Sequence, residues 1–177
     1  MKFKEDFTFP VYIKEKVIKD IEEICKKYDY EVFGYLVGEL FLWKGQNYII
    51  INNYLYKEES SSGNEYNVKE QGETGVAVDD RDIEDKISFN FMEYAGEFDN
   101  LKKKANKESL LRLGWFHSHP DFGCFLSSTD LATQREIFSE SYHVALVVDP
   151  IRDYYKFFTL DNNSNKGYKE LNYAIIS

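Results

Sequence analysis

Two of the three histidines in this 177-residue chain lie one residue apart, at His117 and His119. On an extended strand, such side chains point to the same face, so both imidazoles can reach one metal ion. Asp130 offers a carboxylate as a third ligand. Two imidazoles and one carboxylate leave the fourth tetrahedral position of a zinc ion free for water, as in catalytic zinc sites. The pattern therefore suits hydrolysis.

Other residues in and around this motif have ordinary structural interpretations. Ser127 and Asp130 match a capping box, in which a hydroxyl and a carboxylate bind the free amides at a helix start. Cys124 could close the coordination sphere as a thiolate, although structural zinc sites more often collect several cysteines. His143 is expected to be a hydrogen-bonded residue at the head of a strand. Glu31, which leads an apolar segment, is by itself a solvated strand-end carboxylate.

The elements that precede the motif follow from hydrophobic patterning. Apolar residues recur every three or four positions over Lys14–Lys27, which predicts an amphipathic helix. Two apolar runs, Glu31–Trp43 and Gln46–Tyr56, flank a Lys44-Gly45 turn and predict a β-hairpin. The segment Phe7–Ile13 contains a proline, which lacks an amide donor, and predicts an edge strand.

The elements around and after the motif are predicted in the same way. A buried strand over Leu110–Phe116 brings His117 and His119 to its end, and a helix follows over Ser127–Ser139. Three more strands are predicted over 143–149, 154–160 and 168–176. Helices and strands mixed in this way indicate an α/β sandwich around one mixed sheet.

The middle of the chain has a different composition. Residues Lys57–Asp80 are polar and rich in serine and glycine, which predicts a flexible surface insertion. Substrate clamping and plain disorder are both consistent with a loop of this length. A helix is expected over Asp82–Lys104, and its lysine-rich end suits a helix C-terminus better than a nucleic-acid patch. The length of the chain favours a single domain over residues 1–177.

Composition excludes several classes of function. The net charge is -9, from 22 basic and 31 acidic residues, so the chain is not expected to bind nucleic acid. Two cysteines are too few for a disulfide framework and favour a reducing compartment. No signal peptide and no apolar run long enough to span a membrane is present in the sequence. We therefore expect a soluble, cytoplasmic protein with no membrane partner.

The motif as a whole resembles the signature of a known family. The motif reads His-Ser-His-Pro, then six residues, then Ser127, then two residues and Asp130. This order and spacing resemble the signature of the JAB/MPN domain metalloenzymes, the JAMM isopeptidases that remove ubiquitin and ubiquitin-like proteins. GWFHSHPDFGCFLSSTDLATQ is similar to their eukaryotic deubiquitinating and deneddylating members, and VALVVDPIRD to the strand and turn that follow. EVFGYLVGE resembles the early strand with the catalytic glutamate. The implied fold is the JAB/MPN, cytidine-deaminase-like one: a mixed β-sheet sandwiched by helices.

The resemblance also implies roles for individual residues. One zinc ion per chain would be bound by His117, His119 and Asp130, with water as its fourth ligand. Glu31 would take the proton of that water and pass it to the leaving lysine amine. Ser127 would stabilise the oxyanion of the tetrahedral intermediate, a role compatible with capping the helix. The implied reaction is cleavage after the C-terminal glycine of a ubiquitin or ubiquitin-like protein, from a lysine or an extended precursor.

The resemblance leaves the biological setting open. The partner's C-terminal tail would lie extended beside a strand edge near the site. The chain resembles stand-alone or bacterial members, some of which accompany ubiquitin-like conjugation systems, including those linked to phage defence. One alternative is a non-catalytic MPN scaffold, although the complete ligand set and Glu31 favour an enzyme. Another is a metallopeptidase that processes a sulfur-carrier protein or a small peptide. The oligomeric state is not predicted.

Overall fold

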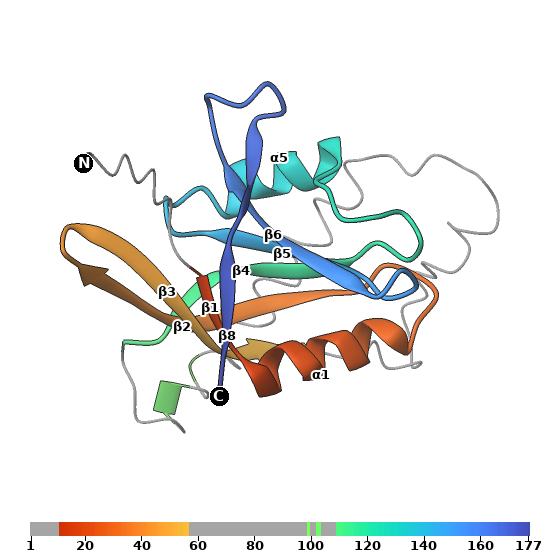
Figure 1. The fold of residues 1–177 in the computed structure, drawn as a ribbon, viewed down its shortest axis with the longest axis horizontal. Helices are drawn as coiled ribbons and strands as arrows, with labels where there is room; N and C mark the ends of the chain where they lie inside the picture. Colours follow the sequence, from red (N-terminus) through yellow and green to blue (C-terminus); the bar gives the residue numbers. More distant parts are fainter. Residues whose placement is uncertain (1–10, 57–98, 100–101, 104–108) are drawn as a thin grey trace, which may run out of the picture.

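The computed structural model describes residues 11–56, 99, 102–103 and 109–177, and there the chain forms one eight-stranded mixed sheet (Figure 1). The strands follow each other across the sheet in the order β7-β6-β5-β4-β2-β3-β1-β8. Their bounds are β1 Val11–Lys14, β2 Phe33–Trp43, β3 Gln46–Leu55, β4 Leu111–Ser118, β5 Val144–Asp149, β6 Tyr154–Leu160, β7 Tyr168–Leu171 and β8 Tyr173–Ile176. The helices whose bounds lie within the described residues are α1, Glu15–Lys26, and α5, Ser128–Ile137. The predicted α/β fold around a mixed sheet is confirmed.

Two apolar cores lie on the two faces of this sheet. Residues of β4 contribute to both: Leu113 and Phe116 belong to one core, and Trp115 to the other. The first core is closed by the apolar stripe of α1, which confirms the predicted amphipathic helix. The second is closed by the α5 region, including Phe138. The sheet is thus covered by α1 on one face and by α5 on the other (Figure 1).

The predicted hairpin is present, and its first strand, β2, pairs with β4 as well as with β3. Strands β2 and β3 pair in antiparallel fashion from Tyr35 to Trp43 around the Lys44-Gly45 turn. Both turn residues have positive φ, 48° and 79°, as a tight two-residue hairpin turn requires. On its other side β2 pairs with β4, which sets Phe33 opposite His117. The segment before β2 therefore reaches the end of β4.

Two predictions about individual strands are wrong. The first strand, β1, lies between β3 and β8, where Val11 and Ile13 are fully buried. The prediction placed this strand at an edge because of Pro10, a residue that lies outside the described part of the chain. The predicted strand over 168–176 is two strands, β7 and β8, which lie at opposite ends of the sheet order although only Asn172 separates them. The sheet must curl so that one residue can connect its two edges.

Some sequence predictions fall outside the described residues. These are the first part of the strand over Phe7–Ile13, the insertion over Lys57–Asp80, and nearly all of the helix over Asp82–Lys104. In the part of the chain that is described, no helix is long and apolar enough to cross a membrane.

Gly114 is required where β4 and β5 run side by side. It has a φ of 153°, and a Cβ there would lie 1.8 Å from the Val144 carbonyl oxygen. We expect Gly114→Ala to lower the free energy of unfolding by about 3 kcal/mol, because the two strands must separate. Gly45→Ala is the control, since Gly45 has positive φ but open space around it. It should cost about 1 kcal/mol. Equal losses in urea titrations would contradict the clash.

Candidate metal centre

Strand β4 and its continuation place the two histidines on the same side of the backbone. His117 is the penultimate residue of β4 and pairs with Val147 of β5. The His119 amide donates to the Val148 carbonyl at 2.8 Å, which extends the pairing beyond the end of the strand. The two Nε2 atoms lie 3.1 Å apart. The predicted convergence of the two imidazoles is therefore observed.

Asp130 completes a three-residue group that could hold a metal ion. Its Oδ2 atom lies 3.2 Å from Nε2 of His117 and 3.2 Å from Nε2 of His119. Ligands about 2.0–2.1 Å from a tetrahedral zinc ion are separated by roughly 3.3 Å, so these three atoms have the spacing that zinc requires. All three residues are buried. The donor set, two imidazoles and one carboxylate, leaves a fourth position for water.

The hydrogen bond made by the other ring nitrogen of His119 supports metal binding. His119 Nδ1 lies 3.1 Å from the Gly123 carbonyl oxygen, which can only accept a proton. Nδ1 therefore carries a proton, so the neutral imidazole has its lone pair on Nε2, the atom that faces His117 and Asp130.

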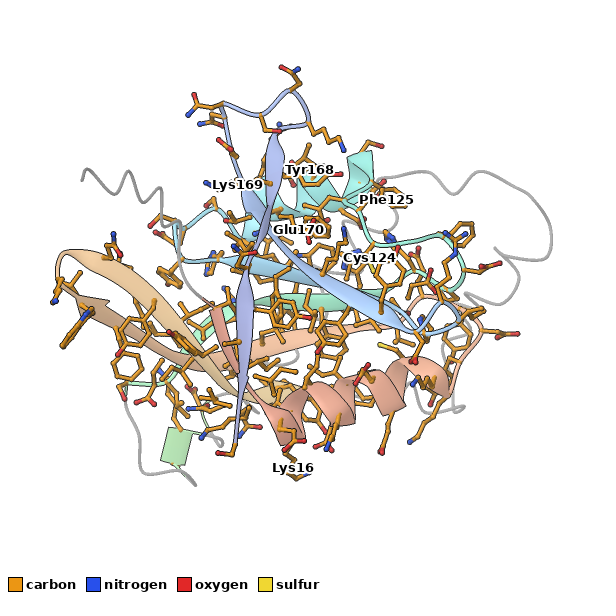
Figure 2. The ribbon with its side chains drawn as sticks, viewed as in Figure 1. Lys16, Cys124, Phe125, Tyr168, Lys169 and Glu170 are labelled. Carbon is orange, nitrogen blue, oxygen red and sulfur yellow. The ribbon has the colours of Figure 1, made fainter. Side chains whose placement is uncertain are left out.

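The ring of Phe125 contacts His119 with centroids 5.0 Å apart. Figure 2 shows Phe125 and Cys124 in the segment that leads into α5.

The start of α5 holds Asp130 in place. The Ser127 amide donates to Asp130 Oδ2 at 2.8 Å, and the Asp130 amide donates to Ser127 Oγ at 3.1 Å. This is the predicted capping box. Burial opposes ionisation of Asp130, but the imidazoles of His117 and His119 outweigh it and hold the pKa of its carboxyl well below the usual range. Asp130 is therefore an anion that faces both rings.

Glu31 comes to this group through a pair of contacts between distant segments. The Val32 amide donates to Ser118 Oγ at 2.9 Å, and the Ser118 amide donates to the Val32 carbonyl at 2.9 Å. These bonds tie the residue after Glu31 to the residue between the histidines. Glu31 Oε1 then lies 3.9 Å from Nε2 of His119. The site therefore joins parts of the chain that are far apart in sequence.

The environment of Glu31 differs from that of Asp130. Its side chain is 51% exposed, so substrate and water can approach it. Protein atoms around the carboxyl group displace water and raise its pKa above the ordinary value, and the charges of the two imidazoles offset part of that rise. A carboxyl group with a raised pKa accepts and returns protons more readily near neutral pH.

A buried hydrogen bond that sequence reasoning missed connects the two ligand-bearing elements. Trp115 Nε1 donates to Gln134 Oε1 at 2.7 Å, and Gln134 Nε2 donates to the Phe138 carbonyl at 3.1 Å. The Trp115 ring stacks on His117, with centroids 4.2 Å apart. These contacts fasten β4 to α5 next to the site. The available signal was weak: a polar residue one turn after Asp130 on a helix that was expected to pack on the sheet.

Cys124 and His143 are not part of the candidate metal group. The Cys124 thiol donates to the Val147 carbonyl at 3.3 Å, and burial raises its pKa. Its Sγ is absent from the cluster of possible ligand atoms among the described residues. His143 Nδ1 accepts a hydrogen bond from the Glu140 amide at 3.1 Å, as expected of an ordinary strand-head residue. The thiolate alternative is therefore not supported by the geometry.

The chain is thus an α/β domain with a mixed sheet between α1 and α5. At the end of β4 it carries a His-His-Asp group that could hold a metal ion. Residues 10–140 match the family described as JAB1/Mov34/MPN/PAD-1 ubiquitin protease. That match spans most of the chain, so the protein belongs to this family, as the resemblance in its sequence implied.

Individual relatives agree with this assignment. The chain is 33% identical over 125 residues to COP9 signalosome complex subunit 5 of Candida albicans, covering 69% of this chain and 17% of that protein. It is 39% identical over 83 residues to 26S proteasome regulatory subunit RPN11 of Eremothecium gossypii, covering 46% and 24%. The Saccharomyces cerevisiae protein named ubiquitin carboxyl-terminal hydrolase RPN11 is 37% identical over 83 residues, covering 46% and 24%. The matches thus span less than a quarter of each relative.

Proposed function

We propose that this chain is a zinc-dependent isopeptidase that cleaves after the C-terminal glycine of a ubiquitin or ubiquitin-like protein. The observation that carries the proposal is the triangle of ligand atoms, with sides of 3.1–3.2 Å, beside the Glu31 carboxylate. A match to the ubiquitin protease family supports the same reaction. We further propose that residues 1–177 form one domain and act in a reducing cytoplasm. The two described cysteines are free thiols.

The proposed metal ligands are His117, His119 and Asp130. When bound there, zinc would acidify its water and polarise the scissile carbonyl. Glu31 then has two tasks, to take the proton from the attacking water and to deliver it to the leaving lysine amine. Its distance of 3.9 Å from Nε2 of His119 allows it to reach a water beside the ligands without being a ligand itself.

Ser127 is proposed to stabilise the oxyanion while it also caps α5. In the capping box its Oγ accepts the Asp130 amide, and a hydroxyl still has its own hydrogen to donate. A donor aimed at the developing oxyanion contributes about 100- to 1,000-fold in kcat. The same side chain can therefore serve the fold and the reaction.

Two substitutions separate these roles of Ser127. We expect Ser127→Ala to cost about 1 kcal/mol of stability and Ser127→Gly only about a few tenths, because glycine is a tolerated cap. Both variants should lose about 100- to 1,000-fold in kcat. Urea unfolding and single-turnover cleavage at saturating substrate measure the two effects. Wild-type kcat in Ser127→Gly would leave Ser127 with the capping role alone.

The substrate proposal concerns the tail of the partner protein. An extended C-terminal segment can add to a strand edge through backbone hydrogen bonds and present its last glycine to the metal group. Stand-alone action in a bacterial ubiquitin-like conjugation or antiphage system is proposed on resemblance alone. Two alternative functions are the processing of a sulfur-carrier precursor or small peptide, and a scaffold without catalytic activity.

Zinc content and substrate cleavage together distinguish these proposed functions. Purified protein is analysed for zinc by elemental analysis, then incubated with ubiquitin-lysine conjugates, C-terminally extended ubiquitin-like precursors, and a sulfur-carrier precursor. We expect about one zinc per chain, and cleavage that a chelator stops and added zinc restores. A folded protein that takes up no zinc would exclude the proposed zinc-dependent enzyme. Zinc uptake without cleavage of any substrate would favour the scaffold.

A further inference from the structure

The last residue of β5, Asp149, gathers an unusual number of backbone amides. It is fully buried. Its Oδ1 accepts hydrogen bonds from the amides of Asp121, Ile151 and Arg152 at 3.0–3.1 Å. Its Oδ2 accepts the Gly123 amide at 2.8 Å. Burial opposes ionisation of Asp149, but these donors outweigh it and hold its pKa below the ordinary value. One carboxylate thus satisfies four amides from two different turns.

One of these turns is the segment that directly follows the second histidine. Within it, Asp121 and Gly123 have positive φ values of 65° and 84°, which is costly for aspartate and needs support from neighbouring groups. The Phe122 amide donates back to the His119 carbonyl at 3.1 Å. The turn is therefore compact, and Asp149 binds it at the residues on either side of Phe122.

The turn matters because it supplies the acceptor for the imidazole of His119. The Gly123 carbonyl lies 3.1 Å from His119 Nδ1, and the Gly123 amide is the group that binds Asp149 Oδ2. Both groups lie on Gly123, so fixing its amide restricts where its carbonyl can point. That carbonyl selects the ring tautomer in which Nε2 keeps its lone pair.

We propose that Asp149 is a positioning residue for His119, acting through Gly123 to fix the orientation and tautomer of this ring. This inference rests on the proposed metal site, because its consequence is tighter metal binding by His119. Asp149 itself belongs to β5 and is not among the candidate ligands. Groups that orient a metal-ligating histidine typically contribute 10- to 100-fold to metal affinity.

Only a carboxylate suits this position. Both oxygens accept amides, three at one atom and one at the other. In Asp149→Asn the side chain has one oxygen and one NH₂ group. It must therefore turn a donor either toward Gly123 or toward the three other amides. Asp149→Asn keeps the size of the side chain while removing the bond to Gly123 or the anchor of both turns.

The test compares metal affinity in Asp149→Asn and wild type by competition with a chromogenic chelator for zinc. We expect the variant to bind zinc about 10- to 100-fold more weakly. In ¹⁵N NMR spectra of the metal-free proteins, wild type should show His119 protonated at Nδ1, and the variant a mixture of tautomers. The matched control is Asp161→Asn, because Asp161 also accepts a turn amide, that of Asn163 at 2.9 Å, between β6 and β7. It should retain wild-type affinity.

A folded Asp149→Asn with wild-type zinc affinity and an unchanged His119 tautomer would overturn the inference. If the variant does not fold, amide exchange in metal-free wild type decides. Slow exchange at Asp121 and Gly123 supports the inference, and rapid exchange refutes it, because a carboxylate that holds the turn must protect both amides. Absence of zinc binding by wild type would instead refute the proposed function, while slow exchange would still show that Asp149 holds the turn.

Discussion

Glu31→Gln is expected to lower the cleavage rate about 100- to 10,000-fold while the protein retains its zinc. Glutamine has nearly the same shape as glutamate but cannot accept the proton of the attacking water. The ligand triangle does not include Glu31, whose Oε1 lies 3.9 Å from Nε2 of His119. Single-turnover cleavage of a ubiquitin-lysine conjugate and elemental analysis of the same sample measure the two properties together.

A matched substitution controls for the loss of one surface carboxylate. Glu23→Gln, at an exposed position of α1 on the opposite face of the sheet from α5, should cleave at the wild-type rate. Equal rates for Glu31→Gln and wild type would refute the assignment of Glu31 as the base. Loss of zinc from Glu31→Gln would mean that Glu31 helps to bind the metal, which contradicts the proposed division of roles.

Asp130→Asn is expected to weaken zinc binding by at least about 100-fold, more than the loss of a residue that only orients a ligand, and to abolish cleavage at limiting zinc. A neutral amide is a poor replacement for the carboxylate, which lies 3.2 Å from both Nε2 atoms. The cap can survive, because the amide oxygen can still accept the Ser127 amide. The measurements are zinc competition and far-ultraviolet circular dichroism.

The outcome of Asp130→Asn separates the ligand from the cap. A folded variant that has lost zinc is the expected result, and a folded variant with wild-type zinc affinity would remove Asp130 from the proposed ligand set. Asp20→Asn serves as the control, since Asp20 lies on α1 and forms an ion pair with Lys16 at 2.7 Å. Its zinc affinity should equal that of wild type, because surface ion pairs contribute little.

Local patterns predicted the elements whose residues lie close together in sequence. The period of α1, the hairpin turn at Lys44-Gly45 and the Ser127–Asp130 capping box all depend on neighbours within about one or two helical turns. Each is found where it was expected. The place of β1 at an edge of the sheet was mispredicted because it depends on a segment that is distant in sequence. Whether β1 has a neighbour on both sides depends on β8, which lies at the far end of the chain.

The same distinction applies to the site. His117, His119 and Asp130 lie within 14 consecutive residues, and the alternation of side chains along a strand was enough to predict that the two rings converge. Glu31 entered the prediction only through resemblance, because nothing near it in sequence indicates a catalytic role. Its approach to His119 depends on the bonds between Val32 and Ser118.

Asp149 is the clearest case of a role that no local pattern reveals. In the sequence it is an aspartate before a proline at the end of an apolar strand, a common turn signal. Parallel pairing of β4 with β5 sets its carboxylate under the turn that follows His119. Side-chain spacing along one strand can indicate which residues could bind a metal. The residues that orient those ligands come from neighbouring strands, so their identity depends on how the sheet is assembled.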